Sequence, residues 1–177
     1  MSFIMIRILS ERANLILKSK KELEANLKIK ISNKGKIIEL SGNAEQEYIA
    51  EKVILAINFS FPIEEALLLK DEEVIFEIIN IKDIARSKNF ERIRGRVIGA
   101  QGKTLKTLST LTDCYLKVKD NQVGIIGYAE AVERCIQALN SLIKGSKWAN
   151  VYSYLEKHHP QPILDYGIRE PKKKSKQ

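Results

Sequence analysis

Ile98-Gly99-Ala100-Gln101-Gly102-Lys103 separates two stretches with helical patterns in the second half of the chain. Three arginines lie upstream, within residues 92–97, and leucines recur at helical spacing downstream, from Lys103 to Thr112. Because glycine has no Cβ, the backbone at Gly99 and Gly102 can approach a ligand closely, and the start of the following helix adds partial positive charge. This loop is therefore predicted to bind phosphate groups.

Two glycines three apart are a weak signal alone, so the flanking elements have to support them. The sequence predicts an α+β fold with the order strand, helix, GxxG loop, helix, strand, strand and helix. The predicted strands are Val74 to Ile81, Cys114 to Lys119 and Gln122 to Ile126, and the last helix is Ala129 to Lys144. This βααββα order, with the loop between its first two helices, resembles the KH domain, a module that binds single-stranded nucleic acid.

The first half of the chain carries a second copy of this pattern. Gly42 and Gly127 begin similar segments, and predicted strands at 27–32 and 36–40 correspond to the later strand pair. At the place of the GxxG loop, however, the first copy has 17–20, which contains no glycine. We therefore expect two tandem KH-type units, the first serving as a scaffold or protein-contacting surface. Whether the first unit also contacts RNA stays open.

The expected division of the chain follows from this repeat. Residues 1–72 form a degenerate KH-like unit that includes a connecting helix, and residues 73–157 form a KH domain with the GxxG loop and an extra C-terminal helix. Residues 158–177 form a basic tail that is predicted to be disordered. The connection, from Asn58 to Asp71, is apolar and reads as a short helix, so it should pack the two units together rigidly.

Charge is distributed unevenly along the chain. The net charge of +8 comes from the second half, because residues 1–85 hold 12 Lys and Arg against 14 Asp and Glu, whereas residues 86–177 hold 18 against 8. A basic surface of this kind suits a polyanion such as RNA. The alternative is a lysine surface that only increases solubility.

Composition argues against several other classes of protein. With 177 residues and 44% hydrophobic content the chain can bury a core, and no apolar run reaches the roughly 20 residues that span a membrane. The start, Met1 to Leu9, lacks a signal-peptide pattern, so a cytoplasmic protein without membrane association is expected. The two cysteines and two histidines show no metal-binding or catalytic spacing. We expect no enzyme activity, no cofactor and no metal.

The predicted RNA-binding residues surround the GxxG loop. Arg92 and Arg96, four apart, share a helix face and are assigned to phosphates together with Lys103, whereas Arg94 points elsewhere and is a surface residue or a contact to another RNA segment. Ile98 is predicted to lie beneath a base, the alternative being a core isoleucine. The full set of candidates is Arg92, Arg94, Arg96, Ile98, Gly99, Ala100, Gln101, Gly102, Lys103, Lys106 and Lys117.

Lys117 is included because it alternates with Lys119 on one side of a predicted strand, where either side chain could form the opposite lip of the RNA groove. The alternative for both lysines is a solvated strand face. About four nucleotides would be held in such a groove.

Three stretches together resemble the archaeal and eukaryotic partner-of-Nob family of KH ribosome-assembly factors. They are the Phe-Pro-Ile-Glu-Glu-Ala-Leu connection, the arginine-rich run at 86–99 and Val151 to Glu156. The resemblance implies two KH units, binding near the 3′ end of small-subunit ribosomal RNA, and partnership with the Nob-type endonuclease on the pre-ribosomal small subunit.

The chain departs from the family pattern in three places. Ala100 and Gln101 are neutral where the family usually has a charged residue, and the first unit lacks the glycines. Asp113 replaces a common glycine, which is tolerable because Asp adopts the left-handed conformation readily. Two alternative functions remain: a KH-fold protein adaptor with little RNA affinity, and a KH regulator of transcription or messenger RNA.

Overall fold

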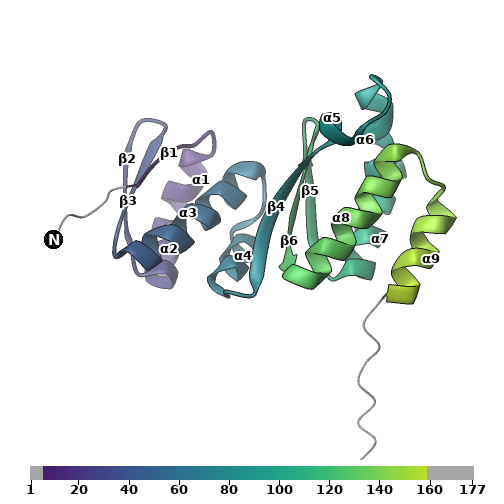
Figure 1. Ribbon diagram of the computed structural model, residues 1–177. Helices are drawn as coiled ribbons and strands as arrows, with labels where there is room; N and C mark the ends of the chain where they lie inside the picture. Colours follow the sequence, from purple (N-terminus) through teal and green to yellow (C-terminus); the bar gives the residue numbers. More distant parts are fainter. Residues whose placement is uncertain (1–5, 159–177) are drawn as a thin grey trace, which may run out of the picture.

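Two three-stranded antiparallel sheets, one in each half of the chain, organise this computed structural model (Figure 1). The structure describes residues 6–158, so the predicted tail from residue 159 onward lies outside the described residues. The elements of the first half are β1 (Ile6–Leu9), α1 (Ala13–Lys18), α2 (Lys20–Leu27), β2 (Lys30–Lys34), β3 (Ile37–Ser41), α3 (Ala44–Phe59), α4 (Ile63–Ala66) and the 3-10 turn η1 (Leu67–Lys70). Those of the second half are β4 (Val74–Asn80), α5 (Ile81–Ile84), α6 (Phe90–Ile98), the 3-10 turn η2 (Ala100–Gly102), α7 (Lys103–Thr112), β5 (Tyr115–Lys119), β6 (Gln122–Tyr128), α8 (Ala129–Lys144) and α9 (Trp148–His158).

The two sheets have the same topology. The strand order is β1-β3-β2 in the first and β4-β6-β5 in the second, with every neighbouring pair antiparallel. Because strand side chains alternate between faces, one face of each sheet carries apolar residues that pack against the helices of its own half. The α+β fold with two KH-type units, predicted from the sequence, is confirmed, and the extra helix α9 packs against α8.

The repeat is visible in the backbone. Among residues 6–158, left-handed or otherwise positive φ angles recur, at the sequence offset that separates Gly42 from Gly127, in three pairs of positions: Lys28 and Asp113, Gly35 and Asp120, Ser60 and Gly145. The helices α3 and α8 and the strands β2 and β5 begin and end at this same offset. Gly99, Gln101 and Gly102 are the positive-φ residues of the described range that have no counterpart in the first half. The positive-φ residues that distinguish the second unit from the first therefore all lie in the GxxG loop.

At the corresponding place in the first unit, only one residue separates two helices. Ser19 lies between α1 and α2 with φ −101°, which is an ordinary value for a residue with a side chain. The first unit thus keeps the helix pair and lacks the loop, as the sequence predicts.

Some predicted boundaries were wrong. Leu27 ends α2 instead of starting a strand, because it is buried on the apolar side of that helix. Asn58 and Phe59 belong to α3, so the connecting helix proper begins only after Pro62, which is its N-cap residue. The short helix α5 was not predicted. The division between residues 72 and 73 stays a prediction. No helix within residues 6–158 combines the length and apolar character needed to cross a bilayer.

An aromatic cluster joins the two units. Phe59 and Phe61, at the end of α3 and just beyond it, pack with Phe76 of β4 at ring-centroid distances of 5.7 to 6.0 Å. These rings cover the face of the second sheet that points away from its own helices. Ile126 of β6 pairs with Phe76 on this face and therefore belongs to the core of the first unit. At Gly124 a Cβ would lie 2.6 Å from the Phe59 ring, so only glycine fits beneath this cluster. The connection packs the two units as the sequence predicts.

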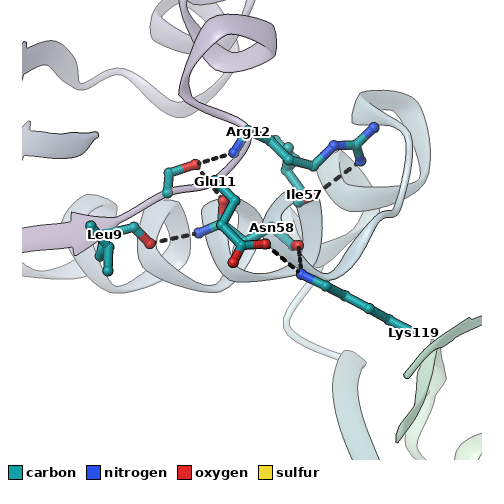
Figure 2. Close-up of polar contacts among 7 residues, drawn as sticks. Leu9, Glu11, Arg12, Ile57, Asn58 and Lys119 are labelled. Carbon is teal, nitrogen blue, oxygen red and sulfur yellow. Dashed lines mark hydrogen bonds and ion pairs between the residues drawn. The ribbon is translucent and has the colours of Figure 1, made fainter. Parts of the chain in front are cut away.

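Polar contacts surround the aromatic cluster. The Nζ atom of Lys119 on β5 lies 3.1 Å from Glu11 Oε2 and donates a hydrogen bond to the carbonyl oxygen of Asn58 at 3.3 Å (Figure 2). Arg12 donates a hydrogen bond to the carbonyl oxygen of Ile57 at 3.1 Å, which closes the end of α3. Residues about 60 and 108 positions apart in the sequence therefore hold the two units in one arrangement.

A second ion pair crosses the same interface. Lys117 Nζ lies 3.8 Å from Glu65 Oε2, a buried oxygen that has no hydrogen-bond partner. Burial raises the pKa of Glu65 above its ordinary value of 4.5, the positive charge of Lys117 opposes this, and Glu64 adds to the rise. A carboxyl group with a raised pKa in the folded state holds its proton more tightly there than in the unfolded chain, so its contribution to stability falls as pH rises through that interval.

We therefore expect the free energy of unfolding of Glu65→Gln, taken relative to that of the wild type, to be higher at neutral pH than below pH 4.5. The measurement is the free energy of unfolding by denaturant on both sides of that pH. Glu72→Gln, an exposed carboxyl with the same change of charge, is the control and should show no such difference. If the ion pair with Lys117 outweighs burial, Glu65→Gln loses stability most at neutral pH, which would contradict the expectation.

Candidate nucleic-acid interface

The GxxG loop is a short, left-handed connection between two helices. Helix α6 ends at Gly99, which has φ 75° and ψ 175°, a combination that only glycine adopts without strain. Gln101 follows at φ 51°, and Gly102 at φ 75° then begins α7. The amide N–H of Gly102 donates a hydrogen bond to the Gly99 carbonyl at 3.2 Å, which closes the loop.

The two glycines serve different purposes. At Gly99 a Cβ would lie 2.1 Å from Thr104 Oγ1 and 2.8 Å from the Thr104 nitrogen, so this glycine is needed for the loop to pack against the first turn of α7. At Gly102 no atom lies within 4 Å of the Cβ position. The sequence predicts a close approach of ligand at both glycines, whereas the structure leaves open space beside Gly102 alone.

Helix α7 begins beside this open space, and no side chain caps its first amides. Gly102 is the N-cap residue and has no side chain to accept hydrogen bonds from them. Such N–H groups and the helix dipole favour an anion. Lys103 and Lys106 are exposed on the same helix, as are Ala100 and Gln101 in the loop. The arrangement can hold phosphate oxygens through backbone amides, with two lysines nearby to neutralise charge.

Ile98 lies at the junction of α6 with the loop. It is half-buried and belongs to neither core cluster of the described residues, whereas its neighbour Val97 is fully buried. The partly exposed position argues against the alternative of a core residue, and a place beneath a base stays a prediction.

The three arginines of α6 point in two directions. Arg94 Nη1 donates a long hydrogen bond, 3.5 Å, to the carbonyl oxygen of Asp120 in the turn between β5 and β6. Arg92 and Arg96 instead face the end of α8, where Arg96 donates a hydrogen bond to the carbonyl oxygen of Ser146. At 100° per residue, Arg94 lies about 200° around the helix from Arg92, which accounts for the separation.

Lys117 lies on the face of the second sheet that is turned to the first unit. It pairs across the ladder with Gly124, the residue beneath the Phe59 ring, and its Nζ reaches Glu65. Its neighbours Leu116 and Val118 point to the opposite face, where they pack with the helices. A role for Lys117 in RNA binding stays a prediction, and its ion pair with the first unit does not favour it.

Val118 is a candidate that the sequence analysis did not name. It is half-buried, it lies on the edge strand β5, and it shares the sheet face of the helices that flank the loop. The signal in the sequence was that Val118 follows Lys117 and so faces the opposite side of the predicted strand. Alternation separates the residues of a strand into two sets, but it does not say which set faces the loop.

Among residues 6–158, no group of three or more His, Cys, Asp or Glu side chains is arranged to hold a metal ion.

Comparison with protein families and curated sequences agrees with this geometry. A family model for the second KH domain of Pno1 proteins, described as a eukaryotic type KH-domain (KH-domain type I), matches residues 75–160. A KH domain-containing protein of Methanocaldococcus jannaschii is 32% identical over 141 residues, covering 77% of this chain and 62% of that protein. The RNA-binding protein pno1 of Drosophila pseudoobscura pseudoobscura is 28% identical over 137 residues, covering 73% and 58%. The chain thus spans about six-tenths of the length of the curated relatives it matches.

Solved structures extend the similarity to both units. Dim2p from Pyrococcus horikoshii is 28% identical with a TM-score of 0.76, covering 86% of this chain and 98% of that one. A chain of the complex of a/eIF2alpha, aDim2p and rRNA from the same organism is 27% identical with a TM-score of 0.77, covering 88% and 93%. The names pno1, from a eukaryote, and Dim2p, from an archaeon, are both names of partner-of-Nob proteins. The chain therefore belongs to the archaeal and eukaryotic partner-of-Nob family of RNA-binding KH proteins.

Proposed function

We propose that this protein is an assembly factor of the small ribosomal subunit that binds single-stranded ribosomal RNA near its 3′ end and positions the Nob-type endonuclease there. The observation that carries the proposal is the loop from Gly99 to Gly102, after which helix α7 begins without a side-chain cap and beside open space at Gly102, in a basic unit. A nucleic-acid backbone fits this loop because its phosphates can bind backbone amides and lysines directly. Glycine places no side chain between the loop backbone and a phosphate.

The proposed binding mode uses one face of the second unit. The RNA backbone would lie along the loop, with phosphates held by the first amides of α7, Lys103 and Lys106. Its bases would turn toward Ile98 and the β5 edge. Arg94 would contact the RNA strand on the side of the turn between β5 and β6. A KH loop of this kind clamps about four nucleotides. The mechanism is recognition and involves no chemical step.

The relatives support the choice of RNA. The structure of a/eIF2alpha, aDim2p and rRNA shows by its name that a relative with the same fold assembles with ribosomal RNA. Our proposal goes beyond that name in three respects: the site residues of the present chain, the small-subunit 3′ region and the Nob-type endonuclease. The first unit, which lacks the loop, would offer a surface for protein contacts.

A binding experiment tests the choice of RNA. We expect single-stranded RNA from the small-subunit 3′ region to bind more tightly than a strand of the same length and shuffled sequence, measured at one fixed salt concentration because electrostatic affinity depends on salt. Adding the protein to a small-subunit precursor should also increase cleavage by the Nob-type endonuclease at the 3′ end. Equal affinity for both strands and unchanged cleavage would favour a general KH regulator. Absence of RNA binding altogether would favour the protein adaptor.

A further inference from the structure

A basic hollow lies between α6 and α8, on the side of α6 that faces away from Arg94. It encloses about 180 Å³, and its lining includes Arg86, Arg92, Arg96 and Lys144. The lining contains no carboxylate, and none of these four cations forms an ion pair within residues 6–158. Like charges gathered without a counter-charge repel one another, so the hollow is suited to an anion.

Arg96 lines this hollow and is the least exposed of its four cations. It donates a hydrogen bond to the carbonyl oxygen of Ser146, and its Nη1 atom lies 3.8 Å from the Cβ position of Gly145. Arg86, Arg92 and Lys144, which also line the hollow, are exposed. A guanidinium group presents several N–H donors in one plane and matches the oxygens of a phosphate.

The internal repeat shows that this end of the second unit differs from its counterpart. Lys144 and Ser146 occupy the repeat positions of Phe59 and Phe61, which in the first unit cover the neighbouring sheet. Ser60 and Gly145, at the centre of the two segments, share the same positive φ, so the segments correspond in structure. The position that joins two units through aromatic rings in the first copy is polar and basic in the second. Its chemistry suits a polyanion and not a further apolar sheet.

We propose that the hollow between α6 and α8 binds a backbone phosphate of RNA from a segment other than the one held at the GxxG loop. Arg92 and Arg96 point away from the side of α6 that carries Arg94, and at 100° per residue Ile98, the proposed wall beneath a base, lies on the Arg94 side. We therefore assign the phosphate in the hollow to a segment other than the four or so nucleotides held at the loop. This proposal rests on the proposed function in one respect: that the phosphate bound in the hollow belongs to RNA. It makes the second unit a clamp on two RNA segments.

The test compares two RNAs bound to the full chain. The first is a single strand of about four nucleotides, the length a KH loop clamps. The second is a longer fragment of the small-subunit 3′ region that includes a helix next to that strand. We expect the double variant R86Q/R92Q to bind the long fragment about tenfold more weakly, and to lower its salt slope by about 1, as for one lost phosphate contact. The short strand should bind as it does to the wild type.

The matched control removes two positive charges from the first unit. K30Q/K36Q changes two exposed lysines of the β2–β3 hairpin that form no ion pair within residues 6–158, and it should leave both RNAs unaffected. Circular dichroism melting checks that both double variants fold.

Three results would overturn the proposal: an unchanged affinity and slope of R86Q/R92Q for the long fragment, an equal loss for the short strand, or an equal loss in K30Q/K36Q. The proposed function is tested separately by the effect of a loop variant on the short strand. Failure of the loop site therefore remains distinguishable from failure of the hollow.

Discussion

Gly102→Asp is expected to lower the affinity for short single-stranded RNA about tenfold or more while leaving the protein folded. The new carboxylate would lie at the N-terminus of α7, beside the amides proposed to hold phosphate. A like charge about 4 Å from a phosphate costs roughly 1 to 4 kcal/mol, depending on how well water screens the pair. Fluorescence anisotropy with a labelled strand measures this loss directly.

The fold should tolerate this change because of the surroundings of Gly102. No atom lies within 4 Å of the Cβ position, so the new side chain meets open space. Its φ of 75° strains a residue with a side chain by roughly 1 kcal/mol, and Asp is among the residues that adopt this conformation. Asp113 already does so at φ 55° in the same chain. Gly99 is a poorer target, because a side chain there would collide with Thr104 and disturb the loop itself.

Gly35→Asp is the matched control. Gly35 has φ 65° and open space around its Cβ position, but it lies in the first unit, in the turn between β2 and β3. The control variant introduces the same charge at the same cost in backbone strain and should bind RNA as the wild type does. If both variants bind alike, the loop is not where RNA is held.

Phe61→Ala should destabilise the protein by about 3 to 5 kcal/mol, the usual cost of removing a buried phenylalanine. Phe61 is fully buried, and its ring lies edge-on to that of Phe76 at 5.7 Å. The substitution leaves a cavity between the units, which neighbouring side chains fill only in part because Gly124 brings no side chain to the gap. Urea unfolding followed by circular dichroism gives the change in free energy.

Tyr48→Ala is the control for this prediction. Tyr48 is an aromatic residue on α3 that is 57% exposed, and the ammonium group of Lys52 lies over its ring, 4.2 Å from the centroid. Its removal should cost less than about 1 kcal/mol. A similarly small loss for Phe61→Ala would mean that the two units contribute to stability independently and that the aromatic cluster does not couple them.

Much of the fold was predictable because local patterns agree with the tertiary structure. Helices α7 and α8 begin and end where the spacing of apolar residues predicts, since each buries a single stripe against its sheet. The internal repeat was visible in glycines and strand pairs, and the structure extends it to matching left-handed residues. Apart from the short helix α5, which was not predicted, the errors lie at the ends of elements. Leu27 is apolar and suits either the end of a helix or the start of a strand until its contacts are known.

Side-chain direction around the loop was predicted less well. The sequence separates Arg94 from Arg92 and Arg96 by helical spacing, but it assigned the latter two to the loop, whereas the structure turns them toward the end of α8. Lys117 and Lys119 were placed on one strand face correctly, and that face proved to be the one that meets Glu65 and Glu11 of the first unit.

The sequence by itself determined the elements, their repetition, the loss of the loop from the first unit and the glycine loop of the second, because each depends on residues close together in the chain. Only the tertiary structure decided which face of α6 and of β5 each basic side chain occupies, and that the basic hollow exists. Periodicity divides a helix or strand into faces, but packing between segments up to 108 residues apart selects which face is covered and which is left to bind.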